Sequence, residues 1–547
     1  MEFSQKLILI APEILLFCGA VVVAVLGLSN SRGIRRAVPF VTALFLAGAV
    51  VGTVYVYRNE DALQASGLLF PRLGLFIKCL IGVAGIGLVA LGTGTIDRTF
   101  ENAVAAGRAR FDPLRVIRGE YHAFFLLSIV GVMLICNATD LIWLFLALEL
   151  SSLPTYVMVA LSRSSRRASE SAIKYFFLGA MSAGLFLYGF ALLYGATGTL
   201  GFLEMRDVLT TMHQSPEGLP AIAILGMTLA LLGIGFKIAA VPMHFYAPDV
   251  YEGAANHMTG FLSIVPKVAG MIAIIMLCGT FGWAEHVTFS PEGTEMIQEG
   301  LPAPVTAVLW MVAVLTMTLG NIGALLQTSI KRIAAYSGIS HSGYMLIGVI
   351  AGTENGIDAV LFYLVAYAIG TLALFGVLSG LSRAGHEVES LEDLAGLWRR
   401  RPRMAAALAL AAGSFVGLPP LLGFWGKLFI FIAGVESGHI VLVTIAAVNS
   451  AISAWYYLHI AGVPIVKMTT PRSEALTPQP NGSPRVVACV AGLALLIVPI
   501  FSRNIYTFAR SSMRYGELTL PVEDATALVD PDTKKTPGPE EDPPEED

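Results

Sequence analysis

The stretch GLPAIAILGMTLALLGIGFKIAAVP, residues 218–242, decides the fold class of this chain. It is apolar over almost its whole length, and about 20 apolar residues are what an α-helix needs to cross a hydrocarbon core of roughly 30 Å. Its single charge, Lys237, is followed five positions later by Pro242. The stretch therefore predicts a membrane-spanning helix that carries a lysine and is broken by a proline.

Apolar runs of this length recur along the chain. Hydrophobic residues make up 55% of its 547 positions, charged residues only 14%, and the mean hydropathy is +0.71, which excludes an ordinary water-soluble domain. Because lipid offers the backbone no hydrogen-bond partner, we predict an all-α integral membrane protein with about fourteen transmembrane helices. Their approximate ranges are 7–28, 37–57, 74–95, 120–138, 139–161, 172–195, 218–241, 257–281, 303–327, 332–352, 357–382, 404–434, 437–464 and 485–505.

Lysine and arginine residues outside these helices are concentrated in the connections that follow odd-numbered helices. Cytoplasmic loops carry the basic excess, so both termini are predicted on the non-cytoplasmic side. The basic loops then serve as orientation signals and do not predict a nucleic-acid partner. The connection after helix 218–241 is an exception, with Asp249 and Glu252 but no basic residue. The acidic, proline-rich tail 515–547 is predicted to be disordered because it cannot bury apolar area.

Cofactor motifs are missing from the sequence. The cysteines all fall inside apolar segments, without a CxxC pair or a histidine spacing suited to a metal. No glycine-rich dinucleotide motif follows a strand pattern, and no Walker or haem-attachment sequence is present. We therefore predict that this chain binds no metal, nucleotide or redox cofactor.

Ionisable residues inside the predicted helices are the candidates for function, because each one costs several kcal/mol at mid-bilayer. Those that lie well inside a helix are Glu149, Lys237, Lys267 and Lys427. Lys78 and Lys174 lie within about one turn of a helix end, where a long side chain can reach the interface. We favour this interpretation for Lys78 and leave it open for Lys174. His341 is a candidate relay because imidazole titrates near neutral pH.

Prolines interrupt two of the helices beside a lysine. Pro242 has no N–H to donate, so the carbonyl of Ile238 loses its helical partner. Pro419 and Pro420 similarly free the carbonyls of Phe415 and Val416 ahead of the next lysine. Irregular backbone at membrane depth is tolerated only inside protein or beside water. Burial disfavours the charged form of a lysine and a nearby carboxylate favours it, so such a residue can be switched. The pattern predicts proton translocation through hydrated breaks.

A weak internal repeat supports this prediction. Segment 175–189, YFFLGAMSAGLFLYG, aligns without gaps with 362–376, FYLVAYAIGTLALFG, and the next helix in each case carries a proline break and a lysine. The offset is five helices, and an odd offset inverts the topology, as in many transporters. The predicted organisation is a three-helix segment 1–119, inverted repeats 120–281 and 303–464, a helix 485–505 and the tail 515–547.

Four blocks occur in the order LELSSLPTYVMVAL (148–161), GFKIAAVPMHFYAPDVYEGA (235–254), QTSIKRIAAYSGISHSGYML (327–346) and GLPPLLGFWGKLFIF (417–431). They resemble the N subunit of bacterial NADH-quinone oxidoreductase, an antiporter-like membrane subunit of respiratory complex I. The resemblance implies a proton-translocating subunit of the bacterial inner membrane, without a redox centre of its own. Quinone, NADH, FMN and iron–sulfur clusters would then be bound by partner subunits.

The resemblance also implies roles for individual residues. Glu149 and Lys237 correspond to the family's carboxylate–lysine pair, and the residues that follow along the proton path are Lys267, His341 and Lys427. Lys174 falls where the family also has a lysine.

The family usually reads GAPxPV after VYEGA, whereas this chain reads GAANHMTGF at 253–261. The unusual His257 therefore either tunes access to Lys267 or caps an interface. Two alternative functions remain open, as a component of a multi-subunit cation/proton antiporter or of a membrane-bound hydrogenase. A purely structural scaffold would leave the buried charges unexplained.

Overall fold

A computed structural model describes residues 7–58, 63, 66–108, 110, 112, 115–163, 165–216, 218–289, 295–352, 355–383, 386–478 and 482–513. The predicted acidic tail, 515–547, lies outside them. Within the described residues, eleven helices are long and apolar enough to cross a membrane, and shorter apolar helices occupy Ala11–Gly27, Ala221–Gly235 and Pro402–Val416. The mostly helical membrane class is confirmed, whereas the count of fourteen spans stays a prediction.

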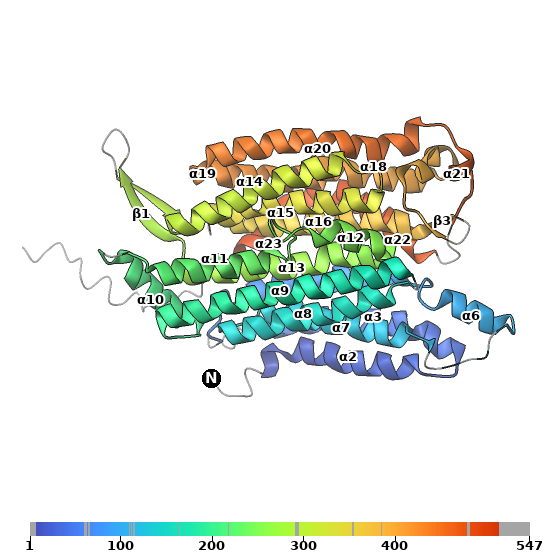
Figure 1. The fold of residues 1–547 in the computed structure, drawn as a ribbon, viewed down its shortest axis with the longest axis horizontal. Coiled ribbons are helices and arrows are strands. Elements are labelled where there is room, and N and C mark those ends of the chain that lie inside the picture. Colours follow the sequence, from blue (N-terminus) through green and yellow to red (C-terminus); the bar gives the residue numbers. More distant parts are fainter. Residues whose placement is uncertain are drawn as a thin grey trace, which may run out of the picture.

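The helices lie side by side along one common direction, as Figure 1 shows. The N-terminal segment contains α2 (Ala11–Gly27), α3 (Arg32–Val56), α5 (Leu73–Gly92) and α6 (Arg98–Ala105). The next part contains α7 (Arg118–Ile135), α8 (Leu141–Leu161), α9 (Arg166–Thr197), α10 (Phe202–Gln214), α11 (Ala221–Gly235), α12 (Tyr246–Gly253) and α13 (Asn256–Phe281).

The C-terminal half begins with α14 (Ala303–Leu325), α15 (Ile330–Ala351) and α16 (Gly356–Gly380). The 3-10 turn η2 (Leu391–Leu394) leads into α17 (Leu397–Arg400), α18 (Pro402–Val416), α19 (Leu422–Glu436), α20 (Ile440–Val466) and α21 (Pro471–Glu474). The last elements are α22 (Ser483–Ile497), the 3-10 turn η3 (Val498–Phe501) and α23 (Ser502–Met513).

Short strands connect some of the helices. The strands β1 (Ala284–Phe289) and β2 (Glu295–Gly300) form an antiparallel hairpin, and β3 (Leu381–Arg383) pairs with both β4 (His386–Glu387) and β5 (Leu476–Pro478). Helix α10 and strand β1 lie at one end of the bundle, and α6, β3 and α21 lie at the opposite end (Figure 1). These polar segments lie outside the apolar runs, so the hydropathy pattern did not predict them.

Both proline breaks are present. Helix α11 ends at Gly235, and the chain passes through turns that contain Pro242 before α12 begins. Within these turns Ala239 has a φ of 55°, a left-handed conformation that non-glycine residues rarely adopt. The predicted helix 404–434 is likewise divided, because α18 ends at Val416 and α19 begins only at Leu422.

The centre of the bundle is formed by α13, α15 and α16. Every residue of α13 is buried, as are nearly all residues of α15 and α16, so these helices are enclosed by their neighbours. Small residues let a neighbouring helix approach closely. A Cβ on Gly320 of α14 would lie 2.7 Å from the backbone nitrogen of Ser340 on α15. Such small-residue contacts are the usual means of helix packing in membranes, and they bring the candidate side chains of different helices together.

Candidate functional site

Glu149 of α8 and Lys237, in the turn after α11, form the first ion pair of the site. Oε1 of Glu149 lies 3.5 Å from Nζ of Lys237, which also donates a hydrogen bond to Oγ of Ser152. Lys237 is buried, and a Cβ on Gly270 of α13 would lie 2.7 Å from its Cβ. The absence of a side chain on Gly270 therefore lets the lysine sit directly against the central helix.

The carbonyl that the break exposes connects this pair to the next lysine. Oγ of Ser342, on α15, donates to the carbonyl of Ile238 over 2.6 Å. The same Oγ accepts a hydrogen bond of 2.9 Å from Nζ of Lys267, which also donates to the carbonyl of Gly338. One serine hydroxyl thus links the broken segment beside Lys237 to Lys267.

His341 of α15 lies between two tyrosine hydroxyls. Its Nδ1 is 2.6 Å from the hydroxyl of Tyr363, and its Nε2 is 2.7 Å from the hydroxyl of Tyr457. The hydroxyl of Tyr457 also hydrogen-bonds to Ser337. A neutral imidazole donates from one nitrogen and accepts at the other, so both contacts can be satisfied at once. The arrangement suits a group that passes a proton from one side of its ring to the other.

Lys427 of α19 is held at the second break. Its Nζ donates 2.8 Å hydrogen bonds to the carbonyl of Val416 and to Oγ of Ser450. The carbonyl of Val416 is one of those that the prolines free from helical hydrogen bonding. The break therefore supplies a hydrogen-bond acceptor for the buried Lys427. In the described part of the chain, neither Lys267 nor Lys427 has a carboxylate within 4.0 Å. Their ammonium groups are held by neutral acceptors alone.

Aromatic rings occupy the space between these groups. Nζ of Lys267 lies 4.6 Å from the ring centroid of Tyr367, and that ring lies 5.2 Å from His341. Tyr344 lies 6.1 Å from the imidazole of His341, and its ring centroid is 5.0 Å from Nζ of Lys427. The structure therefore brings Glu149, Lys237, Lys267, His341 and Lys427 into one largely buried row across the bundle.

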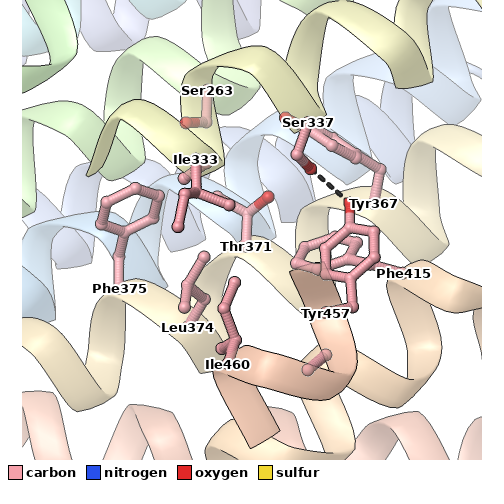
Figure 2. Close-up of a pocket in the computed structure, with 12 residues that line it drawn as sticks. Ser263, Ile333, Ser337, Tyr367, Thr371, Leu374, Phe375, Phe415, Tyr457 and Ile460 are labelled. Carbon is pink, nitrogen blue, oxygen red and sulfur yellow. Dashed lines mark hydrogen bonds between the residues drawn. The ribbon is translucent and has the colours of Figure 1, made fainter. Parts of the chain in front are cut away.

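A small cavity opens beside the middle of this line. Figure 2 shows its lining, which includes the hydroxyl-bearing side chains of Ser263, Ser337, Tyr367, Thr371 and Tyr457. The space open to the centre of a water molecule is about 10 Å³, enough for about one water. Several of the lining groups can hydrogen-bond a water, so the cavity can hydrate the path between Lys267 and His341.

Lys174 does not join the buried line. Its side chain is 43% exposed, and its Nζ lies 2.9 Å from Glu170 and 3.0 Å from Asp249. Asp249 and Glu252 also contact the guanidinium of Arg332, at 2.8 and 3.1 Å. Basic residues of α9 and α15 therefore neutralise the acidic connection that the charge pattern left unexplained.

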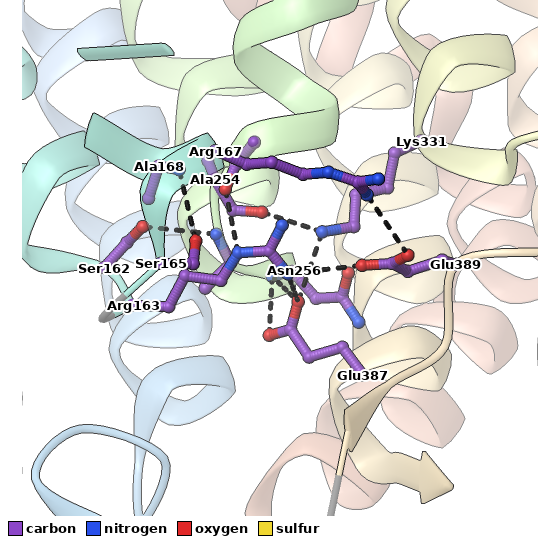
Figure 3. A network of polar contacts seen from close by, with 12 residues as sticks. Ser162, Arg163, Ser165, Arg167, Ala168, Ala254, Asn256, Lys331, Glu387 and Glu389 are labelled. Carbon is purple, nitrogen blue, oxygen red and sulfur yellow. Dashed lines mark hydrogen bonds and ion pairs between the residues drawn. The ribbon is translucent and has the colours of Figure 1, made fainter. Parts of the chain in front are cut away.

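A partly buried polar network, drawn in Figure 3, fixes the start of α13. The carboxylate of Glu387 accepts from the backbone N–H of Asn256 at 3.0 and 3.1 Å and lies 3.2 Å from Nζ of Lys331. Nζ of Lys331 also donates to the carbonyl of Ala254, at 2.7 Å. Burial by itself raises the pKa of the Glu387 carboxyl, but Lys331 and the Asn256 amide outweigh it and hold that pKa below its usual value.

His257 occupies the first turn of α13, about 15 Å along the helix from Lys267. Its Nδ1 lies 3.5 Å from Oγ1 of Thr95, and its ring packs edge-on against Tyr121 at 5.5 Å. The residue therefore packs against α7 and the segment that follows α5, about three turns of helix away from Lys267.

The snorkelling expected for Lys78 is wrong. Its side chain is fully buried, and its Nζ lies 2.6 Å from Oε1 of Glu13 on α2. Glu13 lies inside the first apolar run but was missed as an intramembrane charge. The position of Glu13 within a predicted span was the feature of the sequence that could have indicated the Glu13–Lys78 pair. No group of three or more histidine, cysteine, aspartate or glutamate side chains gathers as metal ligands would in the described part of the chain.

Comparison with known proteins gives the family. The model of the family "NADH:quinone oxidoreductase/Mrp antiporter, TM" matches residues 138–453. The chain belongs to this family. It is 34% identical to the NADH-quinone oxidoreductase subunit N of Nitrosomonas europaea over 507 residues, which cover 92% of this chain and 97% of that protein. The resemblance to N subunits is therefore confirmed.

Solved structures of this antiporter-like family share the fold. A chain of respiratory complex I from Thermus thermophilus matches with a TM-score of 0.69 and 28% identity, over 91% of this chain and 99% of that one. A chain of the Mrp complex from a Dietzia species matches with a TM-score of 0.72 over 95% of this chain and 98% of that one. The latter is only 19% identical and shows the fold alone.

Proposed function

We propose that this chain is the proton-translocating membrane subunit of a NADH-quinone oxidoreductase. Protons move along Glu149, Lys237, Lys267, His341 and Lys427, and quinone reduction in partner subunits drives them. The observation that carries the proposal is the row of contacts and ring approaches that joins these groups between two broken helices. Burying so many ionisable groups in a membrane protein costs free energy, and groups of this kind usually carry function.

The contacts suggest how the first step works. Lys237 has a carboxylate partner at 3.5 Å, whereas Lys267 has only neutral acceptors. A movement of Glu149, or its protonation, weakens the attraction that favours the charged form of Lys237. The proton that Lys237 then loses can pass to Lys267, because Ser342 already bridges the two segments.

The second step uses the imidazole and the cavity. A water in the cavity of Figure 2 can reach the hydroxyls of Tyr367 and Tyr457, which border Lys267 and His341 respectively. His341 accepts a proton at one nitrogen and gives up the other toward Tyr363. Lys427 is the terminal acceptor, and it releases the proton beside the second break.

The finer architecture is part of the proposal. Fourteen spans would arise if the three shorter apolar helices also cross the membrane as parts of broken or tilted spans. The segments 120–281 and 303–464 would be inverted repeats, each containing a long helix followed by a broken one. Both termini would lie on the non-cytoplasmic side of the bacterial inner membrane. Partner membrane subunits would surround the chain, and quinone, NADH, FMN and iron–sulfur clusters would be held by other subunits of the complex.

Proton transport in inverted membrane vesicles tests the proposal. NADH-driven acidification of the vesicle interior should fall strongly in K237A and E149A, while the complex still assembles. Normal pumping in both variants would refute the mechanism. Co-purification after mild solubilisation decides the assembly. Flavin and iron–sulfur subunits are expected, whereas antiporter or hydrogenase subunits in their place would support the alternative functions.

A further inference from the structure

A second carboxylate–lysine pair lies in the N-terminal helices, apart from the line described above. Glu13 is in the first turn of α2, and Lys78 is in the second turn of α5. Both side chains are buried, and Oε1 of Glu13 lies 2.6 Å from Nζ of Lys78. Nδ2 of Asn137, just after α7, donates to the same Oε1 over 3.0 Å, and Lys78 also donates to the carbonyl of Leu9 over 3.3 Å.

Glu13 and Asn137 each have one side-chain oxygen that accepts no hydrogen bond from the described residues. Among the described residues, Oε2 of Glu13 and Oδ1 of Asn137 are buried without a hydrogen-bond partner. Both atoms are pure acceptors when the carboxylate is ionised. Leaving a buried acceptor without a hydrogen bond destabilises the fold. An ion pair that served only to hold α2 against α5 would be more stable if both oxygens accepted a hydrogen bond. The unpaired oxygens therefore suit a donor that binds reversibly, such as a proton.

A cavity lies beside the site, at one end of the bundle. A cavity with about 60 Å³ open to the centre of a water molecule is lined by Leu9, Asn137, Ser66 and Thr139, among others, enough for several waters. Leu9 and Asn137 are the same residues that hold the ion pair. The backbone N–H of Phe202, which opens α10, donates to the carbonyl of Thr139. The cavity is therefore at the α10 end of the bundle, opposite the Glu387 network.

We propose that Glu13, held by Lys78 and Asn137, is a second proton-binding site, which exchanges a proton with water in this cavity. A hydronium ion transfers its proton to Oε2 of Glu13, which leaves a neutral carboxylic acid and one water. Because Oε2 has no other partner among the described residues, Lys78 and Asn137 keep their bonds to Oε1 throughout. The net charge of the pair changes from zero to +1, and release of the proton reverses the step.

Infrared titration of the intact, purified complex tests this inference. Wild type should show a carbonyl stretching band of a protonated carboxyl that depends on pH and shifts in D2O. E13Q should lose that band, whereas it should persist in E149Q, which removes the other pair, and in E392Q, which removes an exposed carboxyl. Identical pH-dependent spectra for wild type and E13Q would overturn the inference.

A variant that retains the acid covers the case in which E13Q fails to assemble. E13D keeps the carboxyl but moves it by one methylene, so the band should shift in frequency or in titration midpoint. A band unchanged in E13D would overturn the inference as well. The readout does not depend on pumping, so the Glu13 site can fail while the proposed function stands, and the reverse also holds.

Discussion

Replacing Glu149 by glutamine removes the charge 3.5 Å from Nζ of Lys237 and keeps the size of the side chain. At an effective dielectric constant of about 20, two unit charges at this separation attract by roughly 4–5 kcal/mol. The carboxylate is 17% exposed, and solvent screening reduces this to about 2–3 kcal/mol. The charged form of Lys237 should therefore become roughly 30- to 150-fold less populated relative to its neutral form.

The assay is NADH-driven proton uptake by inverted vesicles, normalised to NADH oxidation and to the amount of assembled complex. We expect pumping in E149Q to fall at least tenfold. In a double-mutant cycle with K237M, the double variant should be little worse than either single variant, because both remove one shared interaction. Wild-type pumping in E149Q, or losses that simply add in the double variant, would refute the assignment. E392Q, which removes an exposed carboxyl, is the matched control.

Three further outcomes are expected. K427R should block proton release although it keeps the charge, because a guanidinium does not deprotonate in proteins; NADH-driven pumping in vesicles measures the loss. S342A removes the acceptor of Lys267 and the donor to Ile238, and since a hydrogen bond to a charged group contributes about 1.5–3 kcal/mol, pumping should fall roughly 10- to 100-fold. E387Q should lower thermal stability near neutral pH. Because the pKa of folded Glu387 lies below its usual value, the difference from wild type should shrink as the pH falls through that pKa.

Each of these outcomes has a control and a contrary result. K467R changes an exposed lysine in the same way and should pump normally; if K427R did so too, Lys427 would be an electrostatic anchor. T53A removes a buried hydroxyl that bonds only within its own helix, so an equal effect in T53A and S342A would contradict the bridging role. A stability difference between wild type and E387Q that is constant across acidic pH would contradict the ionised state of Glu387.

Much of the site could be predicted from the chain alone. Glu149, Lys237, Lys267, His341 and Lys427 stood out because a charge or an imidazole in an apolar run is rare and costly. The prolines located both breaks, since a residue without an N–H frees a carbonyl at a known position. The carbonyls expected at Ile238 and Val416 do accept hydrogen bonds from side chains, Ser342 and Lys427 respectively.

Other assignments needed the packed bundle. Lys78 and Lys174 look alike in sequence, each near the end of an apolar run, yet one is buried against Glu13 and the other is partly exposed beside Asp249. Tyr367 and Tyr344 carry no signal in sequence that separates them from other core aromatics. Their place in the site is visible only in the structure, where each ring lies between His341 and a lysine of another helix.

The physical reason for this division is the range of the forces involved. Lipid imposes its demand on each segment separately, so the length, apolarity and backbone breaks of a span are local properties of the chain. The partner of a buried charge is chosen by which helix faces meet, and that choice depends on close contacts such as Gly270 against Lys237. The fold class and most of the intramembrane charges could therefore be predicted from the sequence. The row of side chains from Glu149 to Lys427 and the separate Glu13–Lys78 pair came from the packing of helices distant in sequence.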